Sequence, residues 1–276
     1  MRVRPLQVQL RPVPACLRGR REPEATAGGR DVGLVTNGAM MDRDMTRAVL
    51  AAGVRRITFS LDTTDERLAS VLRPGVRVDR VLENIAIFVE ETRAWASRHE
   101  QAPSVAVFCA LCTANAASFE QFVERVSALH VIAVMVSDLN FQENRPRTLW
   151  QAADPNAIDG IDRGVRLAFR KGLIVLSVRG LEELGMEWRY RQWLLVPPSS
   201  LWQRSVKHTY CASPWQTIPV GVDGHVSLCD CQPRLRLGNL LSLPLTSIWN
   251  GRLMVDYRLR MQSNRPPAAC LACPRF

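Results

Sequence analysis

The chain of 276 residues is long enough for one large domain or two modest ones with hydrophobic cores. Its 47% hydrophobic and 22% charged residues exclude collagen-like, wholly disordered and coiled-coil folds. No apolar run reaches the length of a membrane span, and the arginine- and proline-rich N-terminus has no signal-peptide core. We therefore expect a cytoplasmic protein without a membrane partner.

The net charge of +10 is concentrated at the N-terminus, because residues 1–30 hold seven arginines and two glutamates, a balance of +5. Only Lys171 and Lys207 of the 36 basic residues are lysines, which is typical of GC-rich coding sequence. Nucleic-acid sites interleave basic with aromatic residues, and residues 1–30 contain no aromatic residue. We expect a disordered tail over residues 1–30 and no nucleic-acid partner.

Strand and helix patterns alternate after the tail. Residues 55–61 place Ile57, Phe59 and Leu61 on one face, as a strand does, whereas residues 79–97 repeat apolar side chains at helical spacing. The expected order is strand 32–36, helix 42–53, strand 55–61, helix 79–97, strand 104–111, helix 117–129, strand 131–137, helix 158–171 and strand 173–178. Such alternation predicts an α/β fold with a parallel sheet, whose ligands bind at the carboxyl ends of the strands.

The alternating pattern stops near residue 180. Residues 181–204 are rich in Trp and Arg and predict a connector, and the chain from residue 205 to residue 276 is rich in turns and cysteines. We therefore predict three parts after the tail: an α/β part over residues 31–180, the connector, and a small Cys-rich domain over residues 205–276.

Five of the eight cysteines lie in this last part: Cys211, Cys229, Cys231, Cys270 and Cys273. The C-x2-C spacing of Cys270 and Cys273 can bring two sulfurs onto one metal, with Pro274 following as in ferredoxin-type runs. Four thiolates suit a tetrahedral zinc or an iron–sulfur cluster, and the spacing alone does not choose between them. Unligated buried cysteines are the remaining alternative.

The other cysteines and the histidines carry weaker signals. Cys109 and Cys112 form a second C-x2-C pair in or just past a predicted strand, where core packing is favoured over a thioredoxin-like redox pair. Cys16 is assigned no role. His208 and His225 lie near the cysteines and are interpreted as loop histidines, or as groups that hydrogen-bond to the ligands.

Two motifs at strand ends, Thr36-Asn37-Gly38 and Ser60-Leu61-Asp62, resemble those of the radical S-adenosylmethionine (radical SAM) enzymes. Residues 73–75 (RPG) and 83–85 (ENI) continue this resemblance. The C-terminal part is similar to the SPASM/twitch extension of the same superfamily. The matching segments are 211–215 (CASPW), 222–226 (VDGHV), 237–240 (LGNL), 248–250 (IWN), Arg258 and the closing pair Cys270 and Cys273.

The resemblance covers residues 31–276 and implies an incomplete partial (βα)6 radical SAM barrel, followed by an auxiliary iron–sulfur domain. It implies that four residues contact S-adenosylmethionine: Thr36, Asn37, Ser60 and Asp62. From chemistry alone, Asn37-Gly38 is equally a turn and Asp62 equally a helix cap. The resemblance also implies one auxiliary [4Fe–4S] cluster held by Cys211, Cys229, Cys270 and Cys273. Cys231 is then a substitute ligand or a bystander.

The family's defining CxxxCxxC motif does not occur in the sequence, in which Cys16 is the only cysteine before Thr36. A barrel βα unit averages roughly 30 residues, so about two units precede residue 31 in a complete barrel. We therefore expect a truncated enzyme whose tail comes from a frameshift or a misplaced start. Its first strand, over residues 32–36, would then have an unpaired edge.

Three alternative functions are compatible with these sequence features. The first is a radical SAM/SPASM protein whose family reaction cleaves S-adenosylmethionine reductively and abstracts hydrogen from a substrate, inactive as written and with no catalytic residue assigned. The second is a non-catalytic one-cluster remnant or accessory binding protein, and the third is a zinc-stabilised binding module. The substrate, a peptide or a small molecule, is not identified by the sequence, and the resemblance implies an external electron donor.

Overall fold

The computed structural model describes residues 7–8, 32–99, 102–138, 155–179, 211, 213–229 and 235–271. Its larger part is a six-stranded sheet in the order β1-β2-β3-β4-β5-β6, in which every neighbouring pair is parallel. The strands are β1 (Gln7–Val8), β2 (Gly33–Thr36), β3 (Arg56–Ser60), β4 (Ser104–Leu111), β5 (Ala133–Asp138) and β6 (Ile174–Arg179). Each strand lies beside the next one along the chain, as in a partial barrel of βα units.

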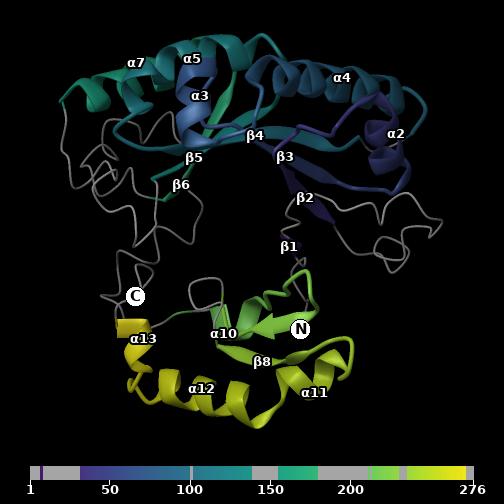
Figure 1. The fold of residues 1–276 in the computed structure, drawn as a ribbon, viewed down its shortest axis with the longest axis vertical. Coiled ribbons are helices and arrows are strands. Elements are labelled where there is room, and N and C mark those ends of the chain that lie inside the picture. The colour runs from purple at the N-terminus through teal and green to yellow at the C-terminus, as the bar shows by residue number, and fades with distance from the viewer. Residues whose placement is uncertain are drawn as a thin grey trace.

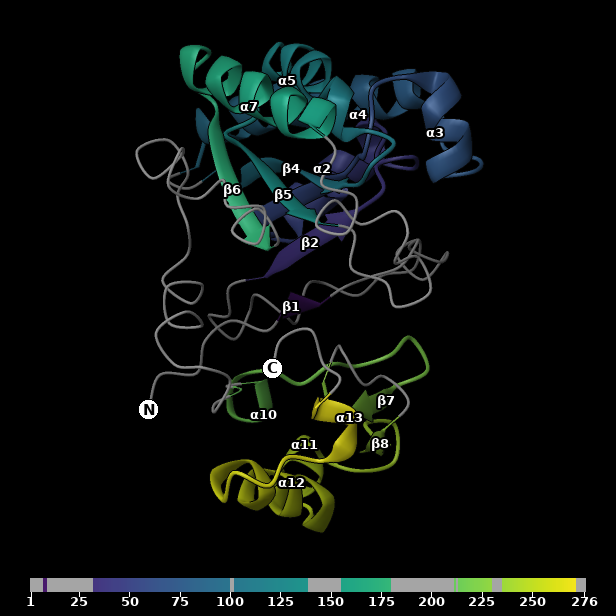
Figure 2. The same ribbon diagram turned by 90° about the vertical axis from the view of Figure 1, so that its left-hand side faces the viewer.

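Helices connect these strands and cover one face of the sheet (Figures 1 and 2). They are α2 (Arg43–Ala51), α3 (Glu66–Leu72), α4 (Val78–Ala96), the 3-10 turn η2 (Ala116–Ser118), α5 (Phe119–Ser127) and α7 (Pro155–Arg170). The arrangement confirms the predicted α/β class and the predicted alternation from residue 32 to residue 178. In the part of the chain that the structure describes, no helix is both long enough and apolar enough to span a membrane.

The core lies between the sheet and these helices. Ile57, Phe59 and Leu61 are at most 1% exposed, which confirms the face predicted from their alternation. From α4, Phe88 meets Phe59 edge to face, with 5.7 Å between the ring centroids. This geometry suits the quadrupoles of the two rings.

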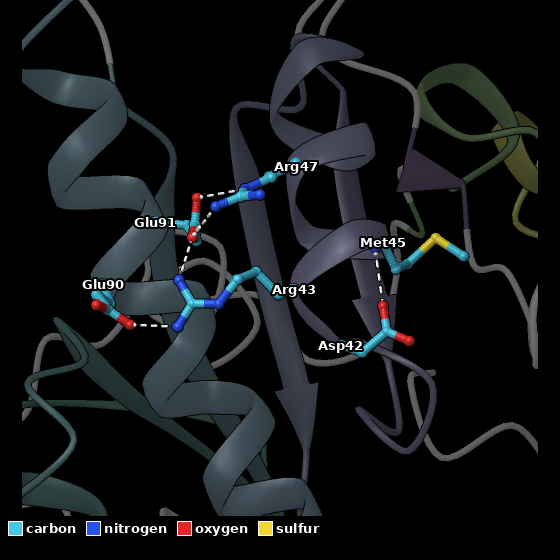
Figure 3. A network of polar contacts seen from close by, with 6 residues as sticks. All are labelled: Asp42, Arg43, Met45, Arg47, Glu90 and Glu91. Carbon is cyan, nitrogen blue, oxygen red and sulfur yellow. Dashed lines mark hydrogen bonds and ion pairs between the residues drawn. The ribbon is translucent and has the colours of Figure 1, made fainter.

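Ion pairs join α2 to α4 across the outer surface (Figure 3). Arg43 donates to Glu90 at 2.8 Å and also to Glu91, which accepts a further bond of 3.1 Å from Nε of Arg47. Helix α2 begins after Asp42, whose carboxylate accepts from the backbone N–H of Met45 at 2.9 Å. Asp42 is therefore the N-cap of α2.

The edge of the first predicted strand is paired, which corrects the expectation of an open edge. Gln7 and Val8 form β1, which lies parallel to Gly33 and Leu34 of β2. Two residues were too short a pattern to predict a strand. Residues 1–6 and 9–31, the rest of the predicted tail, lie outside the described residues, and so does the connector over residues 181–204.

The C-terminal part contains an antiparallel hairpin and four helices among its described residues. The hairpin strands are β7 (His225–Ser227) and β8 (Arg236–Asn239), and the helices are α10 (Ser213–Gln216), α11 (Leu245–Trp249), α12 (Arg252–Gln262) and α13 (Ala268–Leu271). A separate apolar cluster, formed by Leu228, Met254, Tyr257, Met261 and Cys270, is its core. This cluster is separate from the core of the sheet part.

Candidate functional site

Three of the five predicted metal ligands gather around one tyrosine. Tyr257 of α12 is 5% exposed, and its hydroxyl oxygen lies 3.0 Å from Sγ of Cys270 in α13. Cys211 packs against the same apolar cluster. Burial raises the pKa of Tyr257 well above its usual value, and the hydrogen bond to Cys270 and the charges of Cys270, Cys229 and Cys211 raise it further. All three cysteines therefore lie within electrostatic reach of one hydroxyl.

Separate elements bring these cysteines together. Cys211 stands just before α10, Cys229 follows the hairpin strand β7, and Cys270 lies in α13, where its N–H donates to the carbonyl of Pro267 at 2.8 Å. Cys270 belongs to the apolar cluster that contains buried side chains of α12, and Cys211 packs against it. The site is therefore built from segments about 60 residues apart in sequence.

The chemistry of these side chains fits a thiophilic group. Cys229 and Cys270 are buried, and Cys211 is partly exposed. Soft thiolates among apolar side chains suit iron–sulfur clusters and zinc. Among the described residues, no group of three or more His, Cys, Asp or Glu side chains is arranged so that it could hold a metal ion. The other two predicted ligands, Cys231 and Cys273, lie outside the described residues.

Arg258 ties the segment after Cys211 to the helices. Its Nε donates to the carbonyl of Pro214 at 3.0 Å and its Nη1 to the carbonyl of Trp249 at 2.9 Å, while its guanidinium lies 4.2 Å from the centroid of the Trp249 ring. Its Nη2 is buried without a hydrogen-bond partner, and burial lowers the pKa of the guanidinium. Sequence comparison gave Arg258 as a motif residue without a role. These contacts hold the segment just after Cys211 against α11 and α12.

His225 takes part in the hairpin rather than in the cysteine group. Its Nδ1 lies 2.8 Å from a carboxylate oxygen of Asp223, and its Nε2 lies 3.2 Å from Nη1 of Arg236. His225 is the first residue of β7 and pairs with Asn239 of β8, so it is a strand residue and the interpretation of a loop histidine is wrong. His208 lies outside the described residues.

The residues predicted to contact S-adenosylmethionine lie at the carboxyl ends of β2 and β3. Thr36 and Asn37 close a turn, in which their side-chain oxygens accept from the N–H groups of Gly38 and Ala39 at 3.1 and 3.2 Å. Gly38 has φ +75°, and a Cβ there would lie 2.9 Å from the Phe59 ring. Both facts favour glycine.

A buried asparagine fixes this turn from outside the sheet. Nδ2 of Asn84, on α4, donates to the carbonyl of Gly38 at 2.7 Å. Asn84 is fully buried, and its Oδ1 has no hydrogen-bond partner. The motif containing Asn84 is thus explained by a contact between α4 and the end of β2.

Ser60 and Asp62 are both engaged by Arg73, which follows α3. Arg73 donates from Nη2 to Oγ of Ser60 at 2.7 Å and from Nε to Oδ2 of Asp62 at 2.5 Å. The other carboxylate oxygen of Asp62 accepts from the N–H of Ala110 at 2.8 Å. The alternative interpretation of Asp62 as a helix cap is wrong, because Asp65 caps α3.

Cys109 and Cys112 lie beside the same strand ends as Asp62. Sγ of Cys109 donates to the carbonyl of Asp62 at 3.5 Å, and Asn115 bridges the carbonyls of Asp62 and Ala110 at 2.7 and 2.9 Å. Both cysteines are free and at most 2% exposed. Burial raises the pKa of Cys109 well above its usual value, so it is a thiol rather than a reactive thiolate. This agrees with core packing rather than a redox pair.

Comparisons with known proteins match both parts of the chain. Residues 13–94 match the model of the radical SAM superfamily, and residues 211–274 match SPASM, an iron–sulfur cluster-binding domain. The first match begins at residue 13 and so extends into the predicted tail. No curated protein matches the sequence.

Solved structures show the same fold. SuiB from Streptococcus suis bound to S-adenosylmethionine is 12% identical, with a TM-score of 0.58, over 91% of this chain and 54% of that chain. A further SuiB structure is 12% identical, with a TM-score of 0.57, over 91% of this chain and 55% of that chain. The chain therefore spans about half the length of these proteins. It belongs to the radical SAM superfamily and carries a SPASM iron–sulfur cluster-binding domain at its C-terminal end.

Proposed function

We propose that this radical SAM protein holds one auxiliary [4Fe–4S] cluster through Cys211, Cys229, Cys270 and Cys273, with Cys231 as a substitute ligand or a bystander. The observation that carries the proposal is the gathering of Cys211, Cys229 and Cys270 around Tyr257, within a segment that matches an iron–sulfur cluster-binding domain. Four thiolates complete the coordination of such a cluster.

The residues around the cysteines support this role. When bound, the cluster supplies a centre that accepts and releases single electrons. Met254 and Leu228 are at most 4% exposed and exclude water from the side of the site that contains Tyr257. Arg258 holds Pro214, and with it the segment that carries Cys211.

We further propose that Thr36, Asn37, Ser60 and Asp62 contact S-adenosylmethionine. All four lie at the carboxyl ends of adjacent parallel strands, where ligands of such sheets bind. Thr36 pairs with Phe59, so it stands beside the residue that precedes Ser60. Arg73 occupies the side chains of Ser60 and Asp62, so these two can only contact a ligand together with Arg73 or after it moves.

We do not assign cleavage of S-adenosylmethionine to the 276-residue chain, because its sequence contains no CxxxCxxC. By itself it acts as a non-catalytic one-cluster protein, and the family reaction, with its external electron donor and its substrate, belongs to a protein that also contains the motif.

Iron and acid-labile sulfide in the chain, purified without oxygen, test the cluster. We expect iron and sulfide in equal amounts and a brown colour. The Cys229→Ser variant should lose most of the iron, whereas Cys112→Ala, which removes a buried free cysteine of the sheet part, should keep it. A colourless chain that contains one zinc ion would show that the site binds zinc and not a cluster. Iron retained in full by Cys229→Ser and also by the double variant Cys229→Ser/Cys231→Ser would refute the ligand set.

A further inference from the structure

The hydroxyl of Tyr257 is aimed at a proposed cluster ligand. Its oxygen lies 3.0 Å from Sγ of Cys270, well within hydrogen-bonding distance for sulfur, and both residues are 5% exposed. In the free chain either atom can be the donor. A hydroxyl on a buried aromatic ring requires a partner, and here that partner is the sulfur.

Cluster binding fixes the direction of this hydrogen bond. A cysteine that ligates iron is a thiolate, which has no proton to donate. Tyr257 must then be the donor and Sγ of Cys270 the acceptor.

Hydrogen bonds to the sulfurs of a cluster stabilise its more negative, reduced form. They are among the factors that set the reduction potential of iron–sulfur proteins, together with burial and net charge. The hydrogen bond of Tyr257 lies in a dry apolar cluster, where its electrostatic effect is stronger than in water.

We propose that Tyr257 donates a hydrogen bond to Sγ of Cys270 in the cluster-bound protein and thereby raises the reduction potential of the auxiliary cluster. Tyr257 is then a tuning residue that acts through Cys270 and is not itself a ligand. This inference rests on the proposed function, since it requires a cluster on Cys270.

The test is a redox titration of the full chain, followed by electron paramagnetic resonance, after iron and sulfide have been measured in each sample. Tyr257→Phe removes the hydroxyl and keeps the ring. Met261→Leu is the matched control, because Met261 lies one helical turn away in the same apolar cluster and has no hydroxyl. We expect equal iron in all three proteins, a more negative potential in Tyr257→Phe and an unchanged potential in Met261→Leu.

A second variant covers the case in which Tyr257→Phe does not hold iron. Replacing the residue by 3-fluorotyrosine makes the phenol a stronger donor of nearly the same shape, so the potential should become more positive.

Equal iron and an unchanged potential in both Tyr257→Phe and the 3-fluorotyrosine protein would overturn the inference and leave the cluster in place. An equal shift in Met261→Leu and Tyr257→Phe would overturn it too, because packing would then explain both. A wild-type chain without iron would overturn the proposed function and the inference together.

Discussion

Glu91 shows how one carboxylate can hold two helices together. Its side chain is 13% exposed and accepts hydrogen bonds from Arg47 and Arg43, both on α2. These bonds, with the hydrogen bond from Arg47 as the largest cause, lower the pKa of Glu91 below its usual value. Because the folded pKa is lowered, the ionised form stabilises the fold above the unfolded pKa of about 4.3.

We predict that Glu91→Gln lowers the free energy of unfolding at pH 7 by about 1 kcal/mol, the usual size of a partly exposed charged network. The difference from wild type should persist down to the unfolded pKa and then vanish as the pH falls through the lower folded value. Urea denaturation at a series of pH values measures it. Glu83→Gln is the matched control, because Glu83 is 60% exposed and its pair with Arg80 is 3.4 Å long. A difference that is constant down to pH 2 would contradict the prediction.

At the scale of elements, the close contact between α7 and η2 depends on the absence of a Cβ at Gly160. A Cβ on Gly160 would lie 2.5 Å from the carbonyl oxygen of Ala116 and 2.6 Å from backbone atoms of Ala117. These are backbone atoms, so the contact can be relieved only by moving α7 as a whole. Gly160 is therefore required for the two elements to approach this closely.

Gly160→Ala sets two effects of opposite sign against each other. Higher helix propensity favours alanine by about 1 kcal/mol, whereas overpacking of a close contact costs about 1–3 kcal/mol. Because the distances are far below van der Waals contact, we predict a net loss of about 1–2 kcal/mol in the free energy of unfolding. Asp159→Ala, an exposed neighbour on the same helix, should change it by less than about 0.5 kcal/mol. A stabilised Gly160→Ala variant would show that α7 can shift freely.

Sequence patterns predicted the elements of the sheet part well, because their side chains are sorted by burial. The strand over residues 104–111 was predicted with the bounds that β4 has in the structure. Helix α12 was not predicted, since Leu253 and Leu259 are exposed on the same helix that buries Met254, and the apolar residues therefore mark no single face. Helix α3 was missed as well; it has only seven residues and a single buried one, Ala69.

The candidate sites could be predicted from the sequence only in part, because local spacing does not record tertiary contacts. Cysteine spacing predicts a metal site in the C-terminal part, since few other roles explain five clustered thiols, and its ligand set stays a prediction. The bond of Arg73 to Ser60 and Asp62 is a tertiary contact across α3, and Tyr257 meets Cys270 across a turn. Neither contact can be predicted from the spacing of residues in the sequence. Both required the folded chain.

At the scale of the whole molecule, the six-stranded sheet with its helices and the C-terminal hairpin with its helices are separate parts of the chain (Figures 1 and 2). The sheet presents polar strand ends, and the C-terminal part presents thiols in an apolar core. The resemblance implies that S-adenosylmethionine is cleaved at a third element, a cluster held by the three thiolates of CxxxCxxC. A cluster fully ligated by four cysteines has no open iron for the cofactor to chelate.

We therefore predict that the 276-residue chain, loaded with iron and sulfide and reduced with dithionite, forms no 5′-deoxyadenosine from S-adenosylmethionine above a sample without protein. Chromatography of the quenched reaction measures the product, and the iron content of the same sample shows that the C-terminal site is filled. The Cys229→Ser variant is the control, because it lowers the iron content while the product stays at background. Product formed over several turnovers by the wild-type chain, and lost in Cys229→Ser, would mean that the C-terminal cysteines themselves support cleavage.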